Sequence, residues 1–187
     1  GKNALMEKSN TAPTFYMLVG LPGSGKSHLC KNALDGITVH SSDEIRQELT
    51  GDISRQDVNA DVFTLLHKRV IETLTSGESC IYDATNISWK YRKAFLQQLN
   101  KIKCKKVCIL LATPFEVCVE RNMHRDRKVP YGVIERMYKN FDIPYYNEGW
   151  DNIILSYPED SEPYSYGSIE SFIDSQMEES QDTPHHS

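Results

Sequence analysis

The chain has 187 residues, of which 39% are hydrophobic and 10% aromatic, enough for one folded domain with its own core. No apolar run reaches the ~20 residues that span a bilayer, and the N-terminal segment lacks the apolar stretch of a secretory signal, so we expect a cytoplasmic protein without a membrane partner. The net charge of −5 conceals an asymmetry, because residues 1–139 hold all 21 Lys and Arg with 15 acidic residues, whereas residues 140–187 hold 11 acidic residues and neither Lys nor Arg.

The first patterned stretch follows a polar segment, residues 1–13, which we expect to be a disordered lead-in. Residues 14–19 read TFYMLV, a run of β-branched, aromatic and aliphatic side chains that is typical of a buried strand. Residues 20–27 read GLPGSGKS and fit the phosphate-binding pattern G-x-x-x-x-G-K-[ST] at every position. Residues 27–34 then carry apolar side chains at helical spacing up to the stop signal Asp35-Gly36. The motif therefore lies between a strand and a helix, which is its expected structural context.

This motif predicts a site for a nucleoside triphosphate. Its glycines can adopt backbone angles that aim N–H groups at a phosphate chain, and the following helix N-terminus adds partial positive charge. Lys26 can reach the β- and γ-phosphates, and the Ser27 hydroxyl can ligate Mg²⁺. We therefore expect ATP or another nucleoside triphosphate as donor, with Mg²⁺. The candidate nucleotide-binding residues of this segment are Gly20, Gly23, Ser24, Gly25, Lys26, Ser27 and His28.

A second strand is predicted over residues 37–42, which read ITVHSS and run directly into Asp43. Asp43 would lie at or near the carboxyl end of that strand, the edge at which open α/β sheets form their sites. The alternative is that Ser42 or Asp43 caps the helix that follows. Arg46, three residues later, shares a helical face with Asp43.

The middle of the chain continues the alternation of helix and strand. A long amphipathic helix fits the apolar positions from Val58 to Leu74, and a third strand at residues 79–82 ends at Asp83. This places a second acidic residue at a strand end. Further on we expect a helix over residues 89–99 and a central parallel strand over residues 107–112, which are nearly all apolar.

A basic segment follows a predicted helix that has Pro114 at its first helical position. Residues 121–130 hold four Lys or Arg together with His124. Arg121 and Arg125 are four residues apart and share a face if this stretch is helical. One interpretation is a lid that folds arginine side chains over a triphosphate, because the planar guanidinium pairs well with phosphate oxygens. The other is a solvated basic surface.

The alternation of strands and helices predicts an α/β P-loop NTPase fold, in which helices flank a parallel sheet and an Arg-rich lid covers the site. We assign residues 14–157 to this kinase domain, with a last strand at residues 153–155. Residues 158–187 are expected to be an acidic tail or a linker toward a further domain, with a short helix at residues 169–177. The five cysteines contain no C-x-x-C pair, so buried thiols are favoured over disulfides or zinc ligands.

Together these segments resemble the phage-type polynucleotide 5′-hydroxyl kinase family, and most closely the kinase modules of bacterial and phage enzymes that heal RNA ends. The resemblance covers the chain from Phe15 to Leu155. It rests on four motifs in order, which are GLPGSGKS, SSDEIR, DATN followed by Arg92, and RNxxR with VP before VIxRMY. It implies transfer of the γ-phosphate of ATP to the 5′-hydroxyl end of RNA or DNA, in nucleic-acid end repair.

The resemblance also implies roles for single residues. Asp43 would be the general base toward the 5′-hydroxyl, Arg46 would hold the acceptor phosphate, and Arg121 and Arg125 would bind the donor phosphates. Gln56 matches a polar residue near the metal or the phosphates. The implied catalytic set is Lys26, Asp43, Arg46 and Arg125, the acceptor-binding set is Asp43, Arg46, Asp83 and Asn86, and the metal set is Ser27 and Gln56.

Two other functions fit the same motifs. A small-molecule kinase for a nucleoside, sugar or antibiotic would use the phosphate loop, the acidic residue and the lid, but would not need Arg46. A regulatory nucleotide-binding module would need no acceptor site at all. The Asp-x-Asp motif of the phage enzyme's phosphatase domain is absent from this chain, so a phosphatase, phosphohydrolase or ligase partner would lie in another domain.

Overall fold

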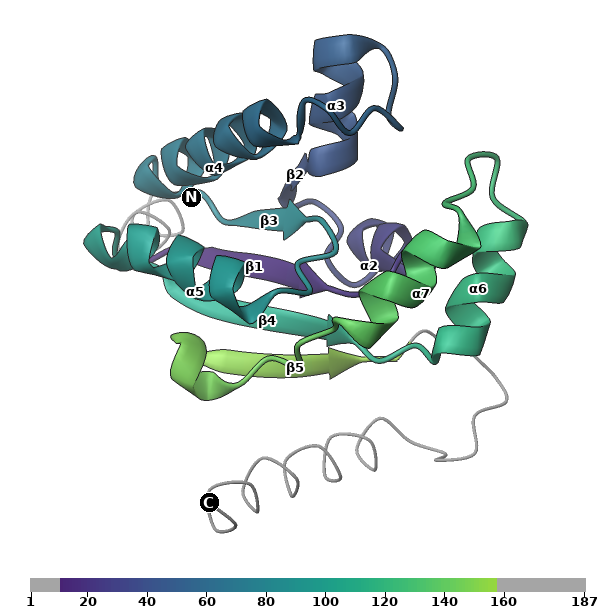
Figure 1. Cartoon of the computed structure of the whole chain (residues 1–187). Coiled ribbons are helices and arrows are strands. Elements are labelled where there is room, and N and C mark those ends of the chain that lie inside the picture. Colours follow the sequence, from purple (N-terminus) through teal and green to yellow (C-terminus); the bar gives the residue numbers. More distant parts are fainter. Residues whose placement is uncertain (1–10, 158–187) are drawn as a thin grey trace, which may run out of the picture.

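Five parallel strands in the order β2-β3-β1-β4-β5 form the central sheet of a computed structural model, which describes residues 11–157 (Figure 1). The strands are β1 (Thr14–Val19), β2 (Thr38–Ser41), β3 (Cys80–Asp83), β4 (Lys105–Leu111) and β5 (Asn152–Ser156). Helices join successive strands, as parallel pairing requires. The predicted α/β fold with a parallel sheet flanked by helices is confirmed.

The helices follow the predicted order. They are α2 (Lys26–Lys31), α3 (Ser42–Thr50), α4 (Asn59–Thr75), α5 (Trp89–Gln98), α6 (Phe115–Met123) and α7 (Tyr131–Lys139), with short 3₁₀ turns η1 (Leu99–Lys101) and η2 (Tyr146–Glu148). The helix expected to reach residue 34 was predicted too long, because α2 ends at Lys31. Asn32 has φ −114° and ψ −86°, outside helical values, and its side-chain amide donates to the carbonyl of His28 at 2.7 Å, which closes the helix there.

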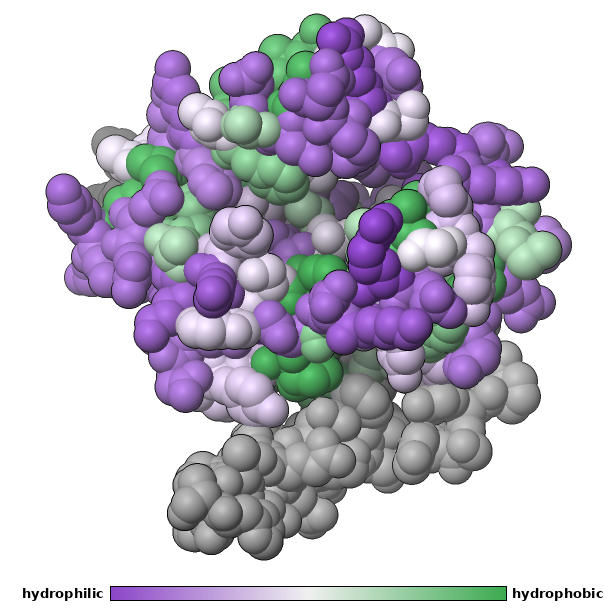
Figure 2. Space-filling model, viewed as in Figure 1, coloured by the Kyte–Doolittle hydropathy of each residue, from purple (hydrophilic) through white to green (hydrophobic). Residues whose placement is uncertain are grey.

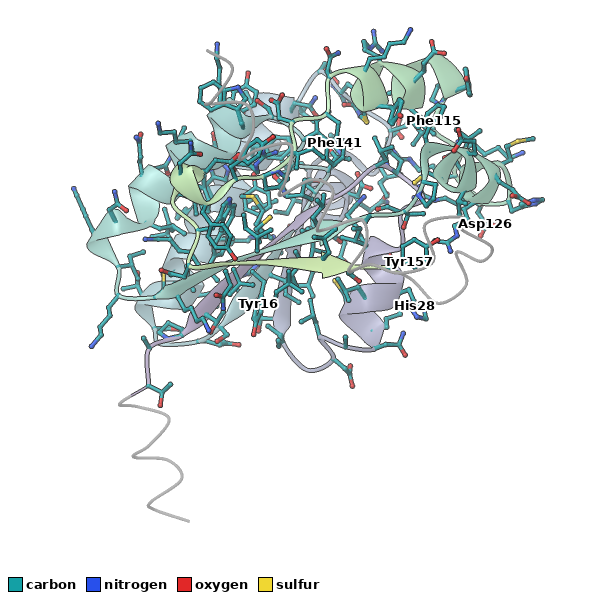
Figure 3. The ribbon with its side chains drawn as sticks, turned by 90° about the horizontal axis from the view of Figure 1, so that it is seen from below. Tyr16, His28, Phe115, Asp126, Phe141 and Tyr157 are labelled. Carbon is teal, nitrogen blue, oxygen red and sulfur yellow. The ribbon has the colours of Figure 1, made fainter. Side chains whose placement is uncertain are left out.

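The side chains of β1 alternate between two hydrophobic layers. Phe15 and Met17 point toward the layer formed with α4 and α5, which buries Leu66 and Phe95 among others. Leu18 points to the opposite layer, which includes residues of α2 and of the connection to β2. Figure 3 shows Tyr16 of β1 and His28 of α2 on one side of the sheet, and Phe141 on the other.

All five strands end at the same edge of the sheet, where their arrowheads point in Figure 1. The connection from β1 to α2, the N-terminus of α3, the segment after β3, and helices α6 and α7 gather around this edge. Carboxyl ends of parallel strands are where open α/β sheets bind ligands. The segments that carry the sequence motifs therefore converge in space.

Two predictions about where helices begin were wrong, those for α3 and α6. Ser41 caps α3, because its hydroxyl accepts from the backbone N–H of Glu44 at 3.3 Å, so neither Ser42 nor Asp43 is the cap. Pro114 is the residue before α6 rather than its first helical residue. All five cysteines are free thiols, and three of them are buried.

The described residues include only the last part of the expected lead-in and none of the acidic tail. Of the expected lead-in, residues 11–13 are described, and the Pro13 carbonyl accepts from the backbone N–H of Lys105 at 2.9 Å. The acidic tail and the predicted helix at residues 169–177 lie outside the described residues. Within residues 11–157, no helix combines the length and apolar content that crossing a membrane requires.

Candidate active site

The phosphate loop, residues 20–25, joins β1 to α2 through close backbone contacts. Gly23 has φ +83°, and a Cβ atom there would lie 2.5 Å from the carbonyl oxygen of Cys118 in α6. Gly20 donates its N–H to the Thr85 carbonyl at 3.0 Å, which ties the loop to the segment after β3. Only glycine fits the position of residue 23, because both the backbone angle and the space exclude a side chain. The loop is thus held in a fixed shape from both sides.

Lys26 begins α2 and lies across this loop. Its ammonium donates to the carbonyls of Gly20 at 3.0 Å and Leu21 at 2.9 Å. Burial lowers the pKa of Lys26, the nearby Asp83 carboxylate opposes this effect, and the Arg125 charge adds to it. The ammonium is therefore a desolvated positive charge at the centre of the loop.

The loop also fits the nucleotide that the motif predicts. The Ser24 hydroxyl is buried and has no hydrogen-bond partner among the described residues, and the glycine cradle would be filled by any Cβ at residue 23. Ser27, in the first turn of α2, is exposed and carries the hydroxyl expected for Mg²⁺. His28 is also exposed and lies on α2 (Figure 3). These donors match a triphosphate with Mg²⁺.

Two carboxylates act on this lysine, Asp83 at the end of β3 and Asp43 in the first turn of α3. Asp83 is the last residue of β3, and its register partner on β2 is Ser41, two residues before Asp43. Burial raises the pKa of Asp83, the Lys26 charge opposes that rise, and the Asp43 charge adds to it. Asp43 also acts on the pKa of Lys26. Lys26, Asp43 and Asp83 therefore form one electrostatic group.

Asp43 is the more accessible of the two carboxylates and is fixed by Arg46. The side chain of Asp43 is 41% exposed, and its Oδ1 accepts from Nη1 of Arg46 at 2.8 Å. Arg46 is buried, and its Nη2 donates to Oδ1 of Asn59 at 2.9 Å. Asn59 in turn donates to Gln56 at 3.0 Å. Gln56 is exposed and is linked to the site through this chain of hydrogen bonds.

Asn86 has a structural contact network of its own. It has φ +50°, and its side-chain amide donates to the Leu18 carbonyl at 2.8 Å and to the Ala84 carbonyl at 3.3 Å. Its own carbonyl accepts from Nη1 of Arg92 at 2.8 Å. Asn86 thus fastens the segment after β3 to β1, next to Asp83, and its side-chain N–H groups are used by backbone carbonyls.

The lid loop, residues 124–130, connects α6 to α7. Its two ends are held together by Asn122, whose side chain accepts from the N–H of Val129 at 2.9 Å and donates to the carbonyl of Val129 at 2.6 Å. Because α6 ends at Met123, Arg125 is not on the helical face that carries Arg121. The charge of Arg125 nevertheless acts on Lys26, whose pKa it lowers.

Arg127 is a site residue that the sequence did not single out. Its Nη1 lies 3.5 Å from Oδ2 of Asp43, and its Nη2 donates to the carbonyl of Ile53 at 3.2 Å. The sequence shows it only as one member of a basic run without a motif of its own. Figure 2 shows mainly hydrophilic side chains around the hollow between α3 and α7.

Within residues 11–157, no three His, Cys, Asp or Glu side chains are grouped so as to hold a metal ion by themselves. The arrangement instead combines a phosphate loop with its lysine, a carboxylate within reach of solvent, and arginines on two sides. Phosphoryl transfer depends on placement and charge neutralisation more than on covalent steps, and these groups supply both.

Comparison with known proteins agrees with this chemistry. The family model described as an AAA domain, AAA_33, matches residues 15–144. The L-seryl-tRNA(Sec) kinase of Methanococcus maripaludis is 27% identical over 143 residues, which cover 72% of this chain and 55% of that protein. The bifunctional polynucleotide phosphatase/kinase of Schizosaccharomyces pombe is 24% identical over 166 residues, which cover 81% of this chain and 38% of that protein.

A solved structure of the Pnkp1/Rnl/Hen1 RNA repair complex is similar with a TM-score of 0.57 and 25% identity, covering 71% of this chain and 46% of the matched chain. This chain therefore spans about half or less of the length of these three relatives. The family match over residues 15–144 includes the phosphate loop, Asp43 and the lid loop.

Proposed function

The chain belongs to the AAA domain family AAA_33 and has a P-loop kinase domain, and on this premise we propose that it transfers the γ-phosphate of ATP to the 5′-hydroxyl end of a polynucleotide. The observation that carries the proposal is the pairing of Asp43 with Arg46 at 2.8 Å beside the Lys26 loop. The pair combines a proton acceptor with a cation for the acceptor strand. A partner domain for end repair, outside this chain, is part of the same proposal.

The donor side of the reaction uses the phosphate loop. Loop N–H groups and Lys26 would hold the β- and γ-phosphates, and Arg121 and Arg125 would approach from the lid. Ser27 would hold Mg²⁺, which when bound neutralises charge on the phosphate oxygens. Gln56, which the resemblance assigns to the metal or the phosphates, is linked through Asn59 to Arg46 and would therefore support the acceptor side. Removal of one such positioned cation costs about 10²–10³ in rate in comparable sites.

The acceptor side uses Asp43. A carboxylate is too weak a base to remove a proton from a free hydroxyl in the ground state, but it orients the hydroxyl and accepts the proton late in the transition state. Arg46 keeps Asp43 in one rotamer and adds a positive charge for the phosphate next to the reacting sugar. Asp83 lies deeper, and its charge opposes the lowering of the Lys26 pKa by burial.

A second candidate is a kinase for a hydroxyl on a different kind of molecule. It is favoured by the 27% identity to L-seryl-tRNA(Sec) kinase, whose name indicates a hydroxyl carried on an RNA. In a small-molecule kinase without a phosphate on the acceptor, Arg46 would have only a structural role. The two proposals therefore differ in what Arg46 contributes to acceptor binding.

The test is transfer of label from γ-labelled ATP to a panel of acceptors, namely 5′-hydroxyl RNA and DNA oligonucleotides, a nucleoside 3′-phosphate, a nucleoside and seryl-tRNA. We expect the oligonucleotides and the nucleoside 3′-phosphate to be labelled, and Arg46→Ala to raise the KM for both. The polynucleotide assignment would be rejected if only seryl-tRNA or the free nucleoside were labelled. It would also be rejected if Arg46→Ala left the labelling of oligonucleotides unchanged. The exposed Arg55→Ala variant is the matched control.

A further inference from the structure

Arg127 reaches from the lid loop to the far side of Asp43. Its Nη1 lies 3.5 Å from Oδ2 of Asp43, while Nη1 of Arg46 binds Oδ1 of the same carboxylate at 2.8 Å. Its Nη2 donates to the carbonyl of Ile53, in the segment between α3 and α4, at 3.2 Å. The lid and the acceptor edge of the sheet thus meet at one carboxylate, which lies between two guanidinium groups.

Both guanidinium groups retain an unused donor. Nε of Arg46 and Nε of Arg127 are buried and have no hydrogen-bond partner among the described residues. Arg46 as a whole is only 5% exposed. Buried N–H groups are nearly always paired in folded proteins, and an unpaired donor on a charged group is especially unfavourable. These two atoms are an independent sign that an acceptor of hydrogen bonds belongs between the lid and α3.

The charges of this cluster favour an anion as that acceptor. Arg46 and Arg127 bring two positive charges to the one carboxylate that pairs with both of them, Asp43. Arginine forks match the oxygens of a phosphate group, to which they donate two parallel hydrogen bonds. The donor phosphates would be held elsewhere, at the phosphate loop and Lys26. The anion expected beside Asp43 is therefore carried by the acceptor.

We propose that Arg127 is the second arginine of an acceptor-phosphate subsite, which makes the lid loop recognise a phosphate on the 3′ side of the reacting nucleoside. This inference rests on the proposed polynucleotide kinase function. When that phosphate binds, Arg127 moves its charge from Oδ2 of Asp43 to the phosphate oxygens. Oδ2 is then left to accept the hydrogen bond of the 5′-hydroxyl, while Arg46 still holds Oδ1.

The contact with Ile53 gives this subsite a second consequence. Because Arg127 also binds the segment between α3 and α4, a phosphate held by Arg46 and Arg127 joins the lid to that segment. The acceptor itself would then complete the enclosure of the site. Acceptors that lack the phosphate would bind to a site whose lid is held by the contacts of Arg127 with Asp43 and Ile53 without the added phosphate, and would be phosphorylated less efficiently.

The experiment compares a nucleoside 3′-monophosphate with the same nucleoside, both as acceptors for the wild type, Arg127→Ala and Arg127→Lys, with Arg55→Ala as the control on an exposed loop. We expect Arg127→Ala to raise the KM for the 3′-monophosphate about 10- to 100-fold, which corresponds to the loss of a charged hydrogen bond. The KM for ATP and the weaker reaction with the nucleoside should change far less than the KM for the 3′-monophosphate, and Arg127→Lys should recover part of the loss.

The outcomes separate this inference from the function on which it rests. A wild type that phosphorylates neither acceptor overturns the polynucleotide kinase proposal and this inference together. If the wild type prefers the 3′-monophosphate and the Arg127→Ala variant prefers it by the same factor, the inference alone is overturned. An Arg127→Ala variant that loses activity with both acceptors by the same factor also overturns it, because that pattern indicates a structural role.

Discussion

Arg92 and Glu148 form a bidentate ion pair in the interior, with Nε to Oε1 at 2.8 Å and Nη2 to Oε2 at 2.9 Å. Their side chains are 1% and 4% exposed. Arg92 also donates to the Asn86 carbonyl at 2.8 Å, and the indole of Trp150 donates to Glu148 at 3.0 Å. The pair therefore connects α5 and η2 to the segment after β3. These contacts stabilise that segment next to Asp83.

We expect Glu148→Ala to be strongly destabilising, because it leaves the Arg92 guanidinium buried without its counter-charge. Loss of one partner of such a pair costs about 3–5 kcal/mol of unfolding free energy. Urea unfolding of the variant measures this cost. Glu135→Ala, which removes the exposed partner of Lys139 at 3.7 Å, is the control and should cost about 1 kcal/mol or less. Equal effects of the two substitutions would contradict the role assigned to the buried pair.

Gly23 and Gly36 provide a matched pair of glycines for testing the phosphate loop. Both have positive φ, +83° and +87°, but a Cβ at residue 23 would meet the Cys118 carbonyl oxygen at 2.5 Å, whereas a Cβ at residue 36 meets nothing within 4 Å. Both substitutions to Ala should cost about 1–2 kcal/mol in backbone strain. Only Gly23→Ala should also displace the loop from α6 and weaken binding of a fluorescent ATP analogue at least about tenfold.

The comparison of the two glycine variants by nucleotide titration and by thermal unfolding separates strain from clash. If Gly23→Ala binds the analogue as tightly as Gly36→Ala does, the close approach of the loop to α6 has no role in nucleotide binding.

Asn122 should control the order of the lid loop. Its side chain pairs with both the N–H and the carbonyl of Val129, and it is 5% exposed. Asn122→Ala leaves two backbone groups unpaired at a cost of about 1–3 kcal/mol. We expect a higher KM for ATP and faster tryptic cleavage after the lid arginines. Asn122→Asp, which keeps the acceptor for the Val129 N–H, should lie between the wild type and Asn122→Ala, and a lid cleaved at the wild-type rate in both variants would reject this role.

The pH dependence of kcat/KM for ATP should reflect the charge of Lys26. Burial lowers its pKa below the ordinary 10.5, and Asp83 partly opposes that shift. Lys26 must be protonated to bind phosphate, so activity is lost as pH rises through its folded pKa, at a pH below 10.5. In Asp83→Asn the opposing charge is gone, so the pKa of Lys26 falls further and the alkaline decline moves to lower pH. An unmoved alkaline limb in this variant would show that Asp83 does not set the charge of Lys26.

Local patterns were sufficient to predict most of the fold. The apolar period between Val58 and Leu74 matches α4, and the strand ends at Asp83 and near Asp43 follow from short apolar runs that stop at polar residues. Local patterns do not predict the end of a helix that is set by the hydrogen bond of a single side chain. Asn32 ends α2 early, and Ser41 replaces Ser42 and Asp43 as the cap of α3.

The candidate site was predictable where a motif has fixed spacing, and not where contacts join distant segments. Asp43 and Arg46 are three residues apart, and their pairing follows from helix geometry. Arg127 and Ile53 are separated by 74 residues in the sequence. The lid loop that carries Arg127 is held by the hydrogen bonds between Asn122 and Val129. Arg92 and Glu148 are 56 residues apart, and no periodicity in one sequence relates them.

The central claim is that Asp43 receives the proton of a hydroxyl that attacks ATP held by Lys26. Single-turnover transfer of labelled γ-phosphate to a 5′-hydroxyl oligonucleotide, measured for the wild type and for Asp43→Asn, tests it most directly. We predict labelling by the wild type and a transfer rate about 10²- to 10⁴-fold lower for Asp43→Asn, with unchanged ATP affinity. Transfer by Asp43→Asn at the wild-type rate, or no transfer by the wild type, would contradict the account.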